Sequence, residues 1–158
     1  MTIELAVVGK TGQAFVDDGL ELYIKRIKRY VNFSLNEIKT PKFSAKTPVK
    51  EIKEKEGEQI LNRVGDKDNY LVLLDEKGKQ LNSIKFASFL LKKMQSGKKK
   101  IVFIVGGAYG FSAAVKQRAD YMLSLSEMTF SHQIIRVIFA EQLYRAFTII
   151  NKEPYHNQ

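Results

Sequence analysis

The chain contains no cysteine, and its 158 residues include two histidines and three prolines. The lack of cysteine excludes disulfides, thiolate catalysis and cysteine-ligated zinc. Two histidines, His132 and His156, are too few for a convincing metal site, so we expect no metal. No apolar run approaches the length of a membrane span, and the run that follows Met1 is too short for a signal peptide. We therefore expect a soluble, cytoplasmic protein with no membrane partner.

Positive charge is in excess, because 26 lysines and arginines stand against 17 aspartates and glutamates, a net charge of +9. Such an excess favours a polyanionic partner, since neutralising phosphates releases counterions and drives binding. A basic but ordinary surface explains the charge equally well. Lys25, Arg26, Lys28 and Arg29 crowd the end of one predicted helix. Cations are favoured there by the helix dipole, and an RNA-facing patch is the equal alternative.

Short apolar strands alternate with amphipathic helices along a chain whose length suits a single domain, residues 1–158. Strands are expected at residues 3–9, 31–38, 70–75, 100–105 and 121–125, and helices at 11–30, 49–64, 83–94, 112–119 and 132–151. Residues 76–79 should break the third strand, Ser83 should cap the next helix, and residues 39–48 should form an exposed loop. Strands that are apolar throughout are typical of parallel sheets buried on both faces. The sequence therefore predicts an α/β fold, with a mostly parallel sheet and helices on both faces.

Three predicted strand ends carry residues suited to a ligand site: Leu74-Asp75, Gly106-Gly107 and Leu125-Ser126. Ligands of open parallel sheets bind beyond the carboxyl ends of the strands. The two glycines allow a ligand to approach the main chain closely, although a plain tight turn explains them equally well. The turn at residues 106–110 is neither a GxGxxG motif nor a P-loop.

The last predicted helix is apolar around its whole circumference, yet it carries Arg136, Glu141 and Arg145. A helix of this kind is normally buried all round, which in so short a chain suggests a second subunit and a twofold dimer. Glu141 and Arg145 stand four residues apart and can form an ion pair. Alternatively, these charges line a cleft at the dimer interface. The tail with Tyr155 and His156 would by default be disordered, and it matters only if it folds back onto that cleft.

Several motifs of the C-terminal half resemble, in order and spacing, those of one enzyme family. They are residues 106–110 (GGAYG), 125–133 (LSEMTFSHQ), 136–137 (RV), 140–146 (AEQLYRA) and 154–156 (PYH). The chain closely resembles the RlmH family, the ribosomal large subunit pseudouridine methyltransferases of the SPOUT class. Residues 6–10 and 55–58 also fit, so the resemblance spans nearly the whole chain.

The resemblance implies a C-terminal trefoil knot over about residues 70–158, an exception to the rule that chains are unknotted. It also implies a homodimer that binds S-adenosyl-L-methionine in the knot at the interface and methylates N3 of a pseudouridine in helix 69 of 23S ribosomal RNA. By the same resemblance, the cofactor would contact Leu74, Gly106, Gly107, Leu125, Ser126, Glu127, Met128, Thr129 and Phe130. A composite catalytic and RNA-facing set would comprise His132, Arg136, Glu141, Arg145, Tyr155 and His156. Asn157 stands where the family often has a basic residue.

Methylation of such a nitrogen requires alignment of the reactants and removal of the N3 proton. Glu141 or a tail imidazole could accept the proton, Arg136 or Arg145 could stabilise the deprotonated base, and solvent could also take the proton. The residue types do not choose among these roles. Two other functions stay open: a noncatalytic ribosome- or RNA-binding module of the same fold, and a small-molecule enzyme that binds a nucleotide at the glycine-rich turn. The second predicts an acidic or metal-binding cluster at the strand ends, of which the sequence shows only Asp75.

Overall fold

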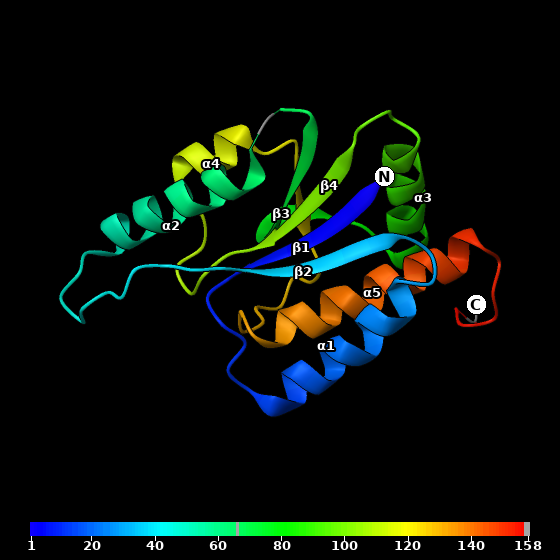
Figure 1. The fold of residues 1–158 in the computed structure, drawn as a ribbon, viewed down its shortest axis with the longest axis horizontal. Coiled ribbons are helices and arrows are strands. Elements are labelled where there is room, and N and C mark those ends of the chain that lie inside the picture. Colours follow the sequence, from blue (N-terminus) through cyan, green and yellow to red (C-terminus); the bar gives the residue numbers. More distant parts are fainter. Residues whose placement is uncertain (66, 157–158) are drawn as a thin grey trace.

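A computed structural model describes residues 1–65 and 67–156 and contains one five-stranded sheet in which all strands are parallel (Figure 1). The strands are β1 (Thr2–Val8), β2 (Asn32–Ile38), β3 (Asn69–Gln80), β4 (Lys100–Val105) and β5 (Tyr121–Ser124). Their order across the sheet is β2-β1-β4-β3-β5. This order makes β4, β3 and β5 neighbours, so their carboxyl ends meet at one part of the sheet edge.

Five helices cover the two faces of the sheet in the described part of the chain. They are α1 (Ala14–Ile27), α2 (Val49–Val64), α3 (Ser83–Met94), α4 (Ala113–Arg118) and α5 (Ile134–Ile150). The first, third and fifth lie on one face, and α2 and α4 lie on the other (Figure 1). Ile3 and Leu5 of β1 belong to the core on the α5 side, whereas Ala6 and Val8 belong to the core on the α2 side. Because both faces are buried, the strand is apolar on both apart from the buried Glu4.

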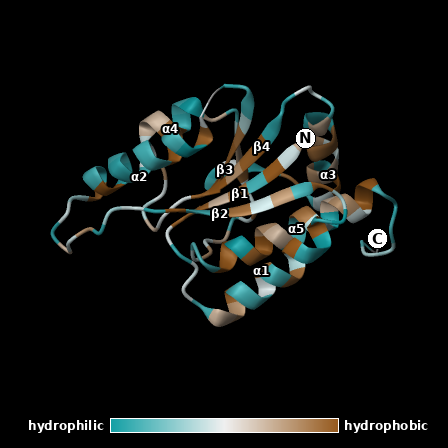
Figure 2. Ribbon diagram, in the orientation of Figure 1, coloured by the Kyte–Doolittle hydropathy of each residue, from teal (hydrophilic) through white to brown (hydrophobic). Residues whose placement is uncertain are grey.

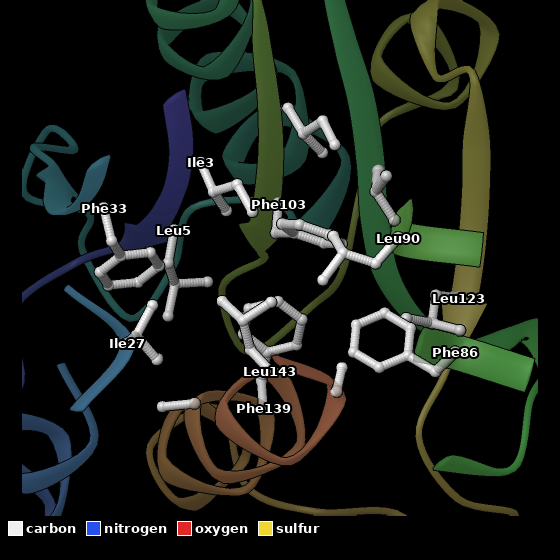
Figure 3. Close-up of a cluster of buried hydrophobic side chains, with 14 of the residues drawn as sticks. Ile3, Leu5, Ile27, Phe33, Phe86, Leu90, Phe103, Leu123, Phe139 and Leu143 are labelled. Carbon is white, nitrogen blue, oxygen red and sulfur yellow. The ribbon is translucent and has the colours of Figure 1, made fainter. Parts of the chain in front are cut away.

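The larger core lies between the sheet and helices α1, α3 and α5 (Figure 3). Phe103 of β4 and Phe139 of α5 are completely buried there, with ring centroids 4.7 Å apart. The core on the opposite face contains fewer buried apolar residues. Helix α2 is largely hydrophilic (Figure 2), and the apolar residues that it buries are mainly Ile52, Ile60 and Val64. The aromatic contact fixes α5 against the centre of the sheet and thereby sets its position relative to the strand ends.

The predicted α/β fold with helices on both faces of a parallel sheet is confirmed. Apart from the end of β3, every helix and strand begins and ends within three residues of its predicted bounds. Two local predictions are wrong. Asn82, not Ser83, caps α3, since its side chain accepts a hydrogen bond from a backbone N–H of the first turn at 2.9 Å. The break predicted at residues 76–79 lies inside β3, which continues beyond it.

A bulge explains why β3 continues through residues 76–79. Leu123 of β5 lies opposite both Leu74 and Lys79 of β3, so the residues between them loop out and strand pairing then resumes. A Cβ atom on Gly78 would lie 2.7 Å from backbone atoms of β5. Only glycine allows so close an approach of the two main chains. The glycine that makes this segment resemble a turn in sequence is therefore required for the contact between β3 and β5.

A buried ion-pair group ties the start of the sheet to α2. Glu4 of β1 is 1% exposed, and its two carboxylate oxygens lie 2.7 Å from Arg63 Nη2 and 2.9 Å from Lys100 Nζ. Burial alone would raise the pKa of Glu4, but the hydrogen bonds from Lys100 and Arg63, together with their charges, lower it below its ordinary value. Folding therefore favours the ionised carboxylate.

We expect the pH dependence of stability to report this group. Because folding lowers the pKa of Glu4, its contribution is fully present above the ordinary value of 4.5 and is lost as pH falls through the folded-state value. In that range the free energy of unfolding should fall by up to about 1.4 kcal/mol per pH unit from this group. Urea unfolding between about pH 6 and about pH 3 should show a steeper loss for wild type than for Glu4→Gln. Glu58→Gln, on the exposed side of α2, should behave like wild type; identical slopes for wild type and Glu4→Gln would refute the assignment.

Candidate active site

A pocket of about 580 Å³ opens at the carboxyl ends of β4 and β5 and at the bulge that follows Leu74 in β3. Leu74, where β3 stops pairing with β4, lines it together with Gly106 and Leu125, which follow β4 and β5, and the strand order predicts a ligand site there. The three segments are far apart in sequence and meet only because the strands are parallel neighbours. A pocket of this volume suits a small organic ligand or cofactor.

The turn after β4 presents its main chain to the pocket. Gly106 and Gly107 both line the cavity. A Cβ atom on Gly106 would lie 3.1 Å from the ring of Phe111, and one on Gly107 would lie 2.6 Å from Oε2 of Glu56. The Gly110 N–H closes the turn by donating to the Gly107 carbonyl at 3.1 Å. Neighbouring side chains thus occupy the space that larger residues would need.

The loop after β5 forms another wall and is tied to β3. The Met128 N–H donates to Ser126 Oγ at 2.9 Å, which tightens the loop. Thr129 Oγ1 donates to Glu76 Oε2 at 2.9 Å, so the loop is held against the bulge of β3. Two of the three walls are therefore linked to each other directly by side chains.

The residues expected to contact a cofactor gather at this pocket, with one exception. Those that line it are Leu74, Gly106, Gly107, Leu125, Ser126, Met128, Thr129 and Phe130. Glu127 is exposed and is not part of the lining. Met128 and Phe130 are 74% and 39% exposed, so apolar surface is available at the pocket mouth.

Charged side chains that sequence reasoning missed also line the pocket. Lys53 of α2 and Lys116 of α4 reach it, and Lys116 Nζ lies 3.4 Å from Asp75 Oδ2. Nothing in the spacing of the lysines marks them, because tertiary packing alone brings α2 and α4 to the strand ends. Asp75 carried a usable signal, since it directly follows a buried run at the end of a strand where ligands bind.

A second group of polar side chains lies at the C-terminal part of α5; we call Glu141, Arg145, Tyr155 and His156 the tail cluster. Arg145 donates to Glu141 Oε1 from Nη2 at 2.6 Å and from Nε at 3.0 Å, which confirms the predicted ion pair. Arg145 Nη1 lies 3.3 Å from His156 Nδ1, and its guanidinium carbon lies 4.7 Å from the centroid of the Tyr155 ring. The tail therefore folds back onto α5 of its own chain.

Arg145 is the permanent cation of the tail cluster. Its hydrogen bond to Glu141 raises the pKa of Arg145 further above its ordinary value. Burial, followed by a hydrogen bond with Tyr23, raises the pKa of Tyr155 to about 12, so this side chain stays a neutral phenol. Among the described residues, His156 Nε2 is buried without a hydrogen-bond partner. The tail cluster thus combines a fixed cation, a phenol and an imidazole with one unused nitrogen.

Contacts outside the tail cluster hold the tail in place. Tyr30 OH donates to Glu153 at 2.6 Å, and the Glu153 N–H donates to the Thr148 carbonyl at 2.8 Å. Lys152 turns the chain with a φ of 57°, the left-handed region. The sequence did not predict a role for Tyr30, because a contact between residues 123 positions apart produces no local pattern. The family departure noted at Asn157 lies outside the described residues.

His132 and Arg136, also expected in the catalytic set, lie away from the tail cluster. His132 lines the pocket. Arg136 is completely buried and does not line it. Its guanidinium donates at 2.9 Å to each of three acceptors, the carbonyls of Val8 and His132 and the hydroxyl of Thr11. Arg136 therefore joins the end of β1 to the start of α5.

Arg136→Lys should destabilise the fold by about 2 kcal/mol, because one ammonium group cannot satisfy three acceptors spread around a planar guanidinium. Urea unfolding measures the change. Arg29→Lys, in the exposed turn that follows α1, should leave stability within about 0.5 kcal/mol of wild type. An equally small effect for Arg136→Lys would show that these hydrogen bonds do not support the fold.

Pocket and tail cluster are separate within one copy of the chain. Ile135 lines the pocket, and Arg145 follows ten residues later on the same helix, about 15 Å at the α-helical rise. Ile134, Ile138 and Ile149 of α5 are only partly buried, so the helix keeps apolar surface that this copy does not cover.

Two other kinds of site find no support in residues 1–65 and 67–156. No three histidine, aspartate or glutamate side chains there gather into a group able to hold a metal ion. No helix in the same part of the chain has the length and apolar character needed to cross a membrane.

Comparison with known proteins decides the family. The sequence profile of a family described as "Predicted SPOUT methyltransferase" matches residues 1–156. Ribosomal RNA large subunit methyltransferase H of Christiangramia forsetii is 45% identical, and that of Parabacteroides distasonis 48%, each over 158 residues and the whole of both chains. The chain belongs to this SPOUT methyltransferase family. Another SPOUT relative with the same name, from Geotalea daltonii, is 44% identical over 99% of this chain and 100% of its own.

Two solved structures share the fold of this SPOUT chain. The tRNA (m1G37) methyltransferase from Aquifex aeolicus aligns with a TM-score of 0.54 at 13% identity, covering 100% of this chain and 76% of that one. A probable methylase family protein from Haemophilus influenzae Rd KW20 gives 0.52 at 13% identity, covering 99% of this chain and 70% of that one. At this identity the likeness shows the SPOUT fold alone.

Proposed function

We propose that the chain is an S-adenosyl-L-methionine-dependent methyltransferase that modifies N3 of a pseudouridine in helix 69 of 23S ribosomal RNA. The pocket at the bulge of β3 and the ends of β4 and β5 carries the proposal, in a chain whose relatives are named ribosomal RNA large subunit methyltransferase H. The net charge of +9 suits an RNA substrate. The enzyme would work in the cytoplasm as one domain, residues 1–158.

The residues of the pocket fit S-adenosyl-L-methionine. The bare main chain of Gly106 and Gly107 permits close approach of a flat ring, and Leu74 and Leu125 supply apolar walls. The exposed side chain of Phe130 adds apolar surface at the mouth. When bound, the cofactor supplies a methyl group already activated on a sulfonium. The residues of the chain have to align the two reactants and manage the proton of the base.

We propose further that a second copy completes the catalytic site. Pocket and tail cluster lie about 15 Å apart along α5 of one copy. The partly buried side chains of Ile134, Ile138 and Ile149 keep apolar surface that a partner could cover. In a twofold dimer whose axis is perpendicular to α5, the two copies of the helix run antiparallel, so each end of the helix faces the opposite end in the partner. The tail cluster of one copy would then stand beside the pocket of the other.

Methylation forms a bond between N3 and the methyl carbon, leaves the electron pair of the broken carbon–sulfur bond on sulfur, and releases the N3 proton. Arg145 rather than Arg136 is the cation available to stabilise the deprotonated base, because Arg136 is buried with its donors engaged. Glu141 Oε1 accepts hydrogen bonds from Arg145 and Tyr155, which suits it to anchor Arg145 rather than to act as a base. Because a guanidinium only donates, the contact with Arg145 makes Nδ1 of His156 the acceptor and leaves the proton of the neutral ring on Nε2. His156 would therefore donate a hydrogen bond to the base, and solvent would take the N3 proton.

The trefoil knot, over about residues 70–158, is part of the same proposal. The bulge of β3 passes so close to β5 that Gly78 touches its main chain. This contact joins the C-terminal segment to β3, at the start of the proposed knot.

Transfer of a labelled methyl group tests the proposed reaction. Ribosomes from a strain that lacks its own enzyme of this family are incubated with the protein and methyl-labelled cofactor, and the nucleosides of the ribosomal RNA are then separated. We expect the label in N3-methylpseudouridine from helix 69. Ribosome binding without transfer would favour a noncatalytic RNA-binding module, and label in another nucleotide would overturn the proposed substrate.

A further inference from the structure

Glu56 of α2 has an environment that the reaction above does not explain. The side chain is 9% exposed, and among the described residues its Oε2 atom is buried without a hydrogen-bond partner. Burial raises the pKa of Glu56 above its ordinary value, and no neighbouring charge contributes. A buried polar group without a partner destabilises the folded chain. Departures of this kind are expected at functional sites, where stability gives way to another requirement.

The carboxyl group of Glu56 lies directly against the glycine turn of the pocket. A Cβ atom built on Gly107 would lie 2.6 Å from Oε2, 2.9 Å from Oε1 and 3.1 Å from Cδ of Glu56. Gly107 lines the pocket, whereas Glu56 does not. The carboxyl group therefore touches the turn without forming part of the cavity wall.

The neighbouring residue of α2 is equally close to the same loop. A Cβ atom on Gly57 would collide with the hydroxyl oxygen of Ser112, the residue that caps α4. Helix α2 thus rests on the loop at two successive residues, Glu56 at Gly107 and Gly57 at Ser112. This double contact ties the position of the glycine turn to that of α2.

We propose that Glu56 is a positioning residue for the cofactor turn: its carboxyl group supports Gly107 from the α2 side and thereby sets cofactor affinity. A side chain at position 107 would have to displace the Glu56 carboxyl group from the turn. The identity of the ligand rests on the proposed function, whereas the support of the turn can be measured without any ligand.

A double-mutant cycle tests the contact, with S-adenosyl-L-methionine as the probe and calorimetry as the readout. Gly107→Ala alone should raise the Kd by at least about tenfold, because its methyl group displaces the Glu56 carboxyl group that supports the turn. In the Glu56→Ala background the same change should raise the Kd by less than about threefold, because the obstacle is gone. Equal effects in the two backgrounds would overturn the proposal.

Single variants at position 56 separate positioning from general stability. Glu56→Ala should raise the Kd by about tenfold and leave kcat at saturating cofactor within about twofold of wild type, whereas Glu56→Gln should keep the Kd within about threefold because it preserves the shape. Glu58→Ala, two residues along the exposed side of α2, is the matched control and should match wild type. A loss in Glu56→Gln as large as in Glu56→Ala would show that charge, not position, sets the affinity.

Amide hydrogen exchange without ligand distinguishes failure of this proposal from failure of the proposed function. Residues 106–110 should exchange about tenfold faster in Glu56→Ala than in wild type or Glu56→Gln, while α3 is unchanged. Unchanged exchange at the turn would overturn the positioning role even if the cofactor binds. Faster exchange in a protein that binds no S-adenosyl-L-methionine would support the positioning role and count against the proposed cofactor. This readout also stands if Gly107→Ala fails to fold.

Discussion

Replacing Arg145 by methionine should slow methyl transfer by a factor of about 100 to 1,000 while leaving cofactor affinity within about twofold of wild type. Two hydrogen bonds to Glu141 and the face of the Tyr155 ring hold the guanidinium in place. A cation fixed in advance stabilises the negative charge that develops on the base as the N3 proton leaves. Methionine keeps most of the length and apolar contact of arginine and removes only its charge and donors.

Single-turnover methyl transfer to ribosomes measures the rate, and calorimetry with the cofactor measures the affinity. Lys92→Met removes a positive charge from the exposed side of α3 and should keep the wild-type rate. An unchanged rate in Arg145→Met would show that the tail cluster takes no part in the chemistry. A loss of affinity as large as the loss of rate would assign Arg145 to cofactor binding instead.

Gly78→Ala should destabilise the fold by more than about 3 kcal/mol or prevent folding, although it adds a single methyl group. The new Cβ atom would lie 2.7 Å from three backbone atoms of Met122 and Leu123 in β5. Backbone atoms in a sheet cannot rotate away as the end of a side chain can. Relief would require the bulge of β3 to separate from β5, which would also open a wall of the pocket.

Gly12→Ala is the matched control, because a Cβ atom there has no neighbour within 4 Å. Its stability should equal that of wild type or exceed it slightly, since alanine restricts the unfolded chain. Urea unfolding and soluble yield compare the two variants. If Gly78→Ala were within about 1 kcal/mol of wild type, the close packing of β3 on β5 would be refuted.

The sheet and its two helical layers can be predicted from the sequence, because strands that are buried on both faces are recognisable as short apolar runs. Ile3 and Leu5 meet one core while Ala6 and Val8 meet the other, so no polar alternation survives. Parallel strands then bring their carboxyl ends to one edge, which makes the pocket walls predictable from strand ends alone. The Glu141–Arg145 pair was predictable for a similar reason, since helical spacing is a local property.

Contacts between distant segments produce no comparable local pattern in the sequence. Arg136 reads as a surface or interface charge on a helical wheel, but its acceptors include Val8 and Thr11, more than 120 positions away. Residues 76–79 read as a turn, but they form a bulge because β5 pairs with β3 on both sides of it. The contact of Glu56 with Gly107 likewise exists only once α2 has packed on the sheet. In each case tertiary packing outweighs the local pattern.

A mixed dimer of two inactive variants tests the composite active site most directly. Gly106→Val should block the pocket, and Arg145→Met should disable the tail cluster. If the Gly106→Val protein fails to fold, Leu125→Arg serves as the pocket variant instead. When the two are produced together, half of the twofold dimers carry one copy of each, and each of these has one intact site. The mixture should therefore recover about one quarter of the wild-type rate of methyl transfer to ribosomes. If every site were built within a single copy, no dimer would contain an intact one, and a mixture as inactive as its two components would contradict the account.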